Sequence, residues 1–245
     1  MLVLVPPSEG KSIGGRGRWK PGSGRFGRAL RTARIEVAAE LVAAIGDEAG
    51  AARLLGVTGD ALAVAVAADR ALLDGPPVLA ARERYSGVVW SHLDADSLGP
   101  DASAWLDDHV AVVSGLHGLV GAGDPTPHYR LKMSSRLGDL GPLSRYWRPR
   151  LDRLVEGRTV IDLLPQEHAA AVPPRGHDWV TVQFSQADGK PAGHFGKAAK
   201  GLFLRALVES RPATSAGVVE VARTHRTTSV TVEPRAHGVA VGIEI

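Results

Sequence analysis

The sequence predicts one mixed α/β domain, in which helices surround a twisted sheet of mixed strand direction. Short apolar runs at residues 2–5, 110–113 and 159–163 are typical of buried strands. Segments with apolar residues at helical spacing lie between these runs, and this alternation is typical of α/β folds. The 245 residues, of which 44% are hydrophobic, can bury one sizeable core, and no linker or repeat divides them. We therefore expect a single domain over residues 1–245.

The amino-terminal half is expected to be mostly helical after its first strand. Apolar residues such as Leu30, Val37 and Leu41 recur at helical spacing. In chain order we expect a strand over 2–5, a loop to about residue 24, a helix over 26–45, a helical pair over 48–72 that is broken from Gly56 to Gly59, and a helix over 77–98.

The carboxy-terminal half is expected to supply most of the strands. In chain order we expect a strand over 110–113, a loop, a helix over 143–155, strands over 159–163 and 179–185, a helix over 195–210, and a hairpin of strands 229–232 and 239–243. In the helix over 195–210, we expect Phe195, Leu202 and Phe203 to face the core.

The composition excludes several kinds of chemistry. The chain has no cysteine, which excludes disulfides, iron–sulfur clusters and thiol-based peroxide reduction. Its nine histidines show no metal-binding spacing, so we expect neither a metal nor another cofactor. No apolar run approaches the ~20 residues that span a bilayer, and the opening Met-Leu-Val-Leu-Val is too short for a signal peptide. We therefore expect a cytoplasmic protein without a membrane partner.

Charge is unevenly distributed along the chain, although the net charge is only +3. Residues 1–35 hold eight basic residues and one acidic residue. Residues 36–111 hold four basic and thirteen acidic residues, and residues 112–212 hold fourteen basic and nine acidic residues. Two basic segments that flank an acidic one predict a surface that attracts phosphate, if they fold together. The alternative is an arginine-rich surface that reflects only the base composition of the genome.

The segment from Ser114 to Met133, SGLHGLVGAGDPTPHYRLKM, contains most of the candidate site residues. It follows the buried strand over 110–113, and α/β proteins commonly bind ligands in loops at the ends of such strands. The alternative is a long surface connection with unrelated polar residues. The candidates for catalysis or anion binding in this segment are Ser114, His117, Tyr129, Arg130 and Lys132.

Lysines outside this segment are further candidates. Lys11 follows the first strand within Gly-Lys-Ser, but Val5 stands where a P-loop requires a glycine. Lys11 is therefore a candidate for binding a phosphate or carboxylate as a single charge. Lys197 and Lys200 lie near the start of the helix over 195–210, where a bound anion would offset their unfavourable interaction with the helix dipole.

The break in the helical pair has two interpretations. A helix-hairpin-helix, which usually reads glycine, apolar residue, glycine, binds DNA phosphates through the amides of its hairpin. Here Gly56 and Gly59 enclose two residues, and Asp60 places a negative charge at the start of the next helix. A plain helical hairpin is therefore the alternative to a DNA-binding one.

Six sequence blocks resemble those of the YaaA peroxide-stress family and occur in the family's order. They are MLVLVPPSEGK, RYSGVVW, SGLHGL, PHYRLKM, LSRYWRPRL and HFGKAAKG, and they run from residue 1 to about residue 205. The resemblance implies a cytosolic bacterial protein that limits oxidative damage, with a mixed α/β domain, a basic cleft and non-specific DNA binding through a helix-hairpin-helix. Where the family usually has a serine and a tyrosine, this chain has Pro165 and His168, with Glu167 retained beside them.

Two hypotheses for the function follow. In the first, a stress-protective protein binds double-stranded DNA without sequence specificity, using Lys11, Arg130, Lys132, Lys197, Lys200, Gly56 and Gly59. In the second, the same cleft is the active site of an enzyme for a nucleobase, a nucleotide or another phosphorylated small molecule. The second is retained because a non-specific DNA groove has no need of a tyrosine or a glutamate. Its candidate catalytic residues are Lys11, Ser114, His117, Tyr129 and Glu167.

Overall fold

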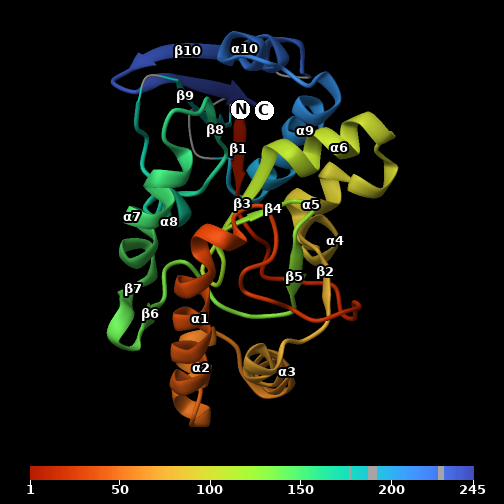
Figure 1. Ribbon diagram of the computed structural model, residues 1–245. Helices are drawn as coiled ribbons and strands as arrows, with labels where there is room; N and C mark the ends of the chain where they lie inside the picture. The colour runs from red at the N-terminus through yellow and green to blue at the C-terminus, as the bar shows by residue number, and fades with distance from the viewer. Residues whose placement is uncertain (177, 187–191, 226–228) are drawn as a thin grey trace.

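A mixed β-sheet runs through the middle of the molecule (Figure 1). The computed structural model describes residues 1–176, 178–186, 192–225 and 229–245. Within these residues the sheet has seven strands, in the order β10 (Ser229–Arg235), β11 (Gly238–Glu244), β9 (Trp179–Ser185), β8 (Val160–Asp162), β1 (Leu2–Val5), β3 (Val110–Ser114) and β4 (Gly118–Gly121). Neighbouring strands from β11 to β3 are parallel. At the two edges, β10 pairs antiparallel with β11 and β4 pairs antiparallel with β3. The mixed α/β fold class is therefore confirmed.

The strand β1 lies inside the sheet with both of its faces covered. All four of its side chains are apolar, and each of them is 0% exposed. It pairs in parallel with β3, where Val3 lies opposite Val110, and with β8, where Val3 lies opposite Ile161. The carboxyl ends of three neighbouring parallel strands therefore meet at one edge of the sheet, which is where open α/β sheets bind ligands.

Helices surround this sheet, and α1 to α3 lie at the opposite end of the molecule from α10 and β10 (Figure 1). The helices are α1 (Gly27–Ala44), α2 (Glu48–Leu55), α3 (Gly59–Arg70), α4 (Ala81–Arg84), α5 (Val88–Leu93), α6 (Pro100–His109), α7 (Leu143–Val155), α8 (Gln166–Ala169), α9 (Gly193–Ser210) and α10 (Ser215–Thr224). Two small sheets pair β2 (Val78–Ala80) with β5 (Pro125–Pro127), and β6 (Arg136–Leu137) with β7 (Gly141–Pro142).

The prediction of one helix over 77–98 is wrong. This stretch contains the strand β2 and the two short helices α4 and α5, followed by a 3₁₀ turn over Ala95–Ser97. The chain turns at Gly87, where a side chain would not fit, because an added Cβ would lie 2.7 Å from the Cβ of Ser8. The close approach of the segment after β1 therefore interrupts the helix, and periodicity within the segment does not reveal it.

The apolar face predicted for the helix over 195–210 is only partly right. Phe195 is 74% exposed and Leu202 is 44% exposed, whereas Phe203 is fully buried as predicted. Leu204 and Val208 are also fully buried, so the buried stripe of α9 is rotated from the predicted one by about one residue.

No single helix in the described part of the chain is long and apolar enough to cross a membrane. The segments Glu48–Leu55 and Gly59–Asp74 reach that length and apolarity only together, and they are bent by 91° where they join.

Two buried arginines fasten the glycine-rich loop that follows β1. Arg34 of α1 is 1% exposed and donates hydrogen bonds to the carbonyl oxygens of Pro21 (2.9 Å) and Leu119 (2.6 Å), among others. Arg84 of α4 is 0% exposed and donates to the carbonyl oxygens of Gly14 (2.8 Å) and Thr126 (3.1 Å). These arginines belong to the interior, so the basic count of their segments overstates the charge available at the surface.

Candidate functional site

A cavity of about 400 Å³ lies where the segments that follow β1 and β8 meet those around residues 87–90 and 129–132. We call it the strand-end cavity. Helix α9 contributes two lysines to its wall. Its lining among the described residues includes the charged side chains of Glu9, Lys11, Arg130, Lys132, Glu167, Lys197 and Lys200. Segments far apart in the sequence therefore place these seven charged side chains around one space.

The structure brings most of the candidate residues together and separates a few. Lys11, Tyr129, Arg130, Lys132, Glu167, Lys197 and Lys200 all line the strand-end cavity. Ser114 and His117 are 0% exposed and do not line it. Gly56 and Gly59 lie at the junction of α2 and α3, outside this cavity. The side chain of His194, in the last sequence block, lies outside what the structure describes.

Lys11 is a half-buried cation of the cavity. Its Nζ donates hydrogen bonds to the carbonyl oxygens of Ser8 (2.9 Å) and Glu9 (3.4 Å), and it lies 4.5 Å from the centre of the Tyr129 ring. Burial lowers the pKa of Lys11 to about 8, and the nearby charge of Arg130 acts in the same direction. Lys11 is therefore a desolvated amine that is still mostly protonated at neutral pH.

A buried carboxyl group lies beside this lysine. Asp69 of α3 is 0% exposed, and its Oδ1 accepts a hydrogen bond from the backbone N–H of Arg130 at 2.8 Å. Burial raises the pKa of Asp69 to about 7, and the charges of Lys11 and Arg130 only partly offset this. This hydrogen bond attaches the 129–132 segment to α3.

The hydroxyl group of Tyr129 lies in the interior of the protein. It is within 2.7 Å of Ser114 Oγ and 2.8 Å of the Tyr85 hydroxyl, and burial raises the pKa of Tyr129 to about 12. Ser114 Oγ also accepts a hydrogen bond from the backbone N–H of His117. These contacts fix the ring of Tyr129, while the face of that ring lies against the Lys11 ammonium.

His117 is packed among aromatic rings. Its ring meets those of Trp19 and Tyr129 edge-on, at centroid distances of 5.8 and 5.4 Å. Neither ring nitrogen has a hydrogen-bond partner among the described residues. Burial holds the pKa of His117 well below its usual value, so the ring is neutral and belongs to the core.

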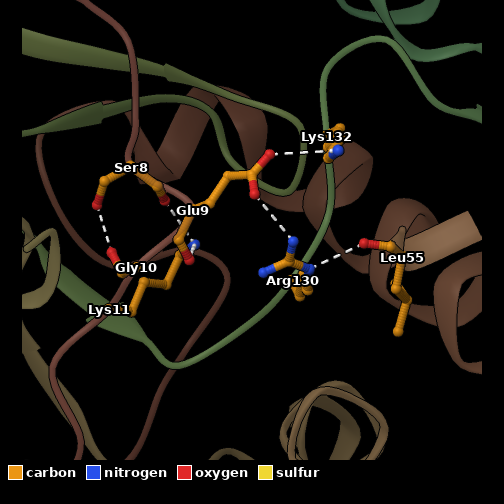
Figure 2. Close-up of polar contacts among 7 residues, drawn as sticks. All are labelled: Ser8, Glu9, Gly10, Lys11, Leu55, Arg130 and Lys132. Carbon is orange, nitrogen blue, oxygen red and sulfur yellow. Dashed lines mark hydrogen bonds and ion pairs between the residues drawn. The ribbon is translucent and has the colours of Figure 1, made fainter. Parts of the chain in front are cut away.

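Glu9 connects two cations that line the cavity (Figure 2). Its Oε2 lies 2.9 Å from Nη2 of Arg130, and its Oε1 lies 3.2 Å from Nζ of Lys132. Arg130 also donates from Nε to the carbonyl oxygen of Leu55 at 2.8 Å. Sequence reasoning missed this role of Glu9, although the residue lies in the segment that follows β1.

Glu167 and His168 form a second polar group on the cavity wall. The Nδ1 of His168 lies 2.9 Å from the carbonyl oxygen of Val113, and its Nε2 lies 3.3 Å from Oε1 of Glu167. Burial lowers the pKa of His168, while the charge of Glu167 opposes that effect. Lys200 donates to the carbonyl oxygen of Leu163, and burial lowers the pKa of Lys200 to about 8.

The junction of α2 and α3 is a tight turn beside Lys132. Gly56 (φ +64°) and Gly59 (φ +58°) both adopt left-handed backbone conformations, and the Nζ of Lys132 would lie 3.3 Å from a Cβ added to Gly56. A surface groove next to this turn is lined by Arg53, Lys132 and Arg136, among others. The helix-hairpin-helix interpretation stays a prediction.

In the described part of the chain, no group of three or more histidine, aspartate or glutamate residues could hold a metal ion.

The fold and the cavity define a mixed α/β protein with a charged cavity at its strand ends. The chain belongs to the family described as Peroxide stress protein YaaA, whose profile matches residues 1–225. It is 38% identical over 235 residues to a UPF0246 protein of Streptomyces coelicolor, covering 91% of this chain and 89% of that protein. It is 34% identical over 242 residues to a UPF0246 protein of Corynebacterium efficiens, covering 95% of each chain. The family resemblance is confirmed, and the family's name supports a stress-related role.

Proposed function

We propose that this protein contributes to peroxide-stress protection by binding a phosphorylated small molecule, of the nucleobase or nucleotide class, in the strand-end cavity. The observation that carries the proposal is the buried Lys11 ammonium, whose hydrogen bonds among the described residues go only to backbone carbonyl oxygens. Asp69 and Glu9 act on this ammonium by charge, but neither accepts a hydrogen bond from it among the described contacts, and burial raises the pKa of Asp69 to about 7. A desolvated ammonium that is only partly compensated is costly, and a bound anion would supply a direct partner.

The size and charge of the cavity support a small anionic ligand. Its volume of about 400 Å³ lies within the range of ligand pockets and is too small for a DNA duplex. Lysine and arginine side chains outnumber glutamates among its lining residues by five to two. The rings of Trp90 and Tyr129 border the wall and give it an apolar part, as ligand pockets usually have.

The first test is the effect of Lys11→Met on ligand binding. We expect wild-type protein to bind adenosine monophosphate in a calorimetric titration, and the variant to bind it about 10- to 100-fold more weakly, because a charged hydrogen bond is lost. Wild-type affinity should also fall as the pH rises above about 8, where Lys11 loses its proton. Mass spectrometry of extracts from purified protein should detect a phosphorylated compound that the variant lacks.

The control is Lys20→Met, which removes an exposed lysine that does not line the cavity. It should bind like the wild type, and thermal melting should show that both variants are folded. A wild-type protein that binds neither adenosine monophosphate nor inorganic pyrophosphate, and carries no phosphorylated compound, would contradict the proposed function.

Non-specific DNA binding is the second candidate function, and the surface beside the α2–α3 turn favours it. Arg53, Lys132 and Arg136 gather around Gly56, so cations accompany the turn that the DNA-binding interpretation requires. We expect Lys132→Ala to weaken binding of a DNA duplex equally for all sequences and to reduce its salt dependence by about one unit of slope. Unchanged binding at matched salt would remove this surface from the DNA hypothesis.

A further inference from the structure

We propose that Arg130 and Lys132 form the phosphate-binding subsite of the strand-end cavity, and that the carboxylate of Glu9 competes with the ligand for this subsite. The inference rests on the proposed function, because it assumes that the cavity binds a phosphorylated compound. It adds the position of the phosphate and identifies a residue of the chain itself as an internal competitor.

The contacts of Glu9 are those of a bound anion. One carboxylate oxygen lies 2.9 Å from Arg130 and the other lies 3.2 Å from Lys132, so the group bridges two cations from the same segment (Figure 2). Two oxygens of a phosphate group can bridge the same pair, because carboxylates and phosphates share this mode of binding to arginine. The carboxylate therefore marks the position that a phosphate would take.

The guanidinium of Arg130 is held in this subsite by contacts that do not involve Glu9. Nε of Arg130 donates to the carbonyl oxygen of Leu55 at 2.8 Å, and the Arg130 backbone N–H donates to Asp69 Oδ1 at 2.8 Å. Two contacts to α2 and α3 therefore hold Arg130 when Glu9 moves. A preorganised guanidinium of this kind loses little entropy when it binds a new anion.

Glu9 can leave the subsite without disturbing the fold. Its side chain is 64% exposed, and ion pairs this exposed contribute little to stability. The backbone next to it is held separately, because Ser8 Oγ accepts a hydrogen bond from the Ser86 backbone N–H and the Ser8 carbonyl oxygen accepts one from Lys11. A rotation of the Glu9 side chain alone therefore vacates the space between Arg130 and Lys132.

Glu9 competes as a charged group. Its partial burial acts to raise its pKa, but the contacts with Lys132 and Arg130 outweigh this and lower the pKa of Glu9 below its usual value. The carboxylate is therefore ionised at neutral pH. It repels an incoming phosphate and also occupies its ligands, so its removal should strengthen anion binding in two ways.

The test is Glu9→Gln, with inorganic pyrophosphate as the probe at low ionic strength and constant pH. We expect the variant to bind pyrophosphate about 5- to 10-fold more tightly than the wild type, and the gain to shrink as salt is added. In the Arg130→Met background, pyrophosphate should bind more weakly and Glu9→Gln should strengthen it clearly less than in the wild type, because only the charge repulsion and the Lys132 contact remain. This double-mutant cycle separates competition for the subsite from a general effect of charge.

The matched control is Glu167→Gln, which removes the same charge from another wall of the cavity. A gain equal to that of Glu9→Gln would mean that only the net charge matters and would overturn the subsite. A wild-type protein that binds pyrophosphate in a Lys11-dependent manner, with no gain from Glu9→Gln, would overturn the subsite and leave the proposed function intact. Failure of every variant to bind pyrophosphate would overturn both, and a gain seen only with a DNA duplex would overturn the assignment to a small ligand.

Discussion

Replacing Arg34 with methionine is expected to lower the free energy of unfolding by about 3–5 kcal/mol. The guanidinium donates to four backbone carbonyl oxygens, those of Pro21, Ser23, His117 and Leu119. Methionine fills a similar volume but donates nothing, so buried carbonyl groups lose their partners. Equilibrium unfolding in urea measures the loss.

The matched control for this prediction lies on the same helix. Arg28→Met removes an arginine from an exposed position of α1 and should change the free energy of unfolding by no more than about 0.5 kcal/mol. If Arg34→Met cost less than about 1 kcal/mol, the loop after β1 would not depend on Arg34, and the interior role assigned to this arginine would be wrong.

The sequence predicts the centre of the fold well because the centre is decided by burial. A strand that is covered on both faces needs an unbroken apolar run, and β1 and β3 each provide one. The helix over 77–98 fails for the opposite reason. Gly87 interrupts it to let Ser8 pass, and a contact between residues so far apart leaves no periodic pattern.

The position of the candidate site is likewise easier to predict than the direction of its side chains. Parallel strands end at one edge, so the segments after β1 and β8 had to lie near each other. Whether a side chain next to a strand end points outward or inward depends on its neighbours. Ser114 is held inward by Tyr129, whereas Glu9 is held in the wall of the cavity by Arg130.

His168 is the site residue for which the sequence offers least guidance, and its two ring nitrogens have different partners. A carbonyl oxygen only accepts hydrogen bonds, so the Nδ1 of His168 must donate to Val113. In a neutral ring Nε2 then carries no proton and can only accept a hydrogen bond. It nevertheless lies 3.3 Å from a carboxylate oxygen of Glu167, which is also an acceptor. The charge of Glu167 favours the protonated imidazole and burial of His168 opposes it, so these two effects meet at the wall of the cavity.

If the cavity carries out chemistry, Glu167→Gln is expected to abolish protection while the protein stays folded. The glutamine amide can still donate a hydrogen bond to Nε2 of His168, but it cannot accept a proton as a carboxylate does. Loss of a general acid or base typically slows a reaction 10²–10⁴-fold. The measurement is complementation of a peroxide-sensitive strain, with adenosine monophosphate and DNA binding measured on the same purified variant. Glu209→Gln, which alters an exposed ion pair with Arg205 on α9, is the control and should protect fully. Full protection by Glu167→Gln would mean that the cavity binds its ligand without using this carboxylate, which would favour a binding protein over an enzyme.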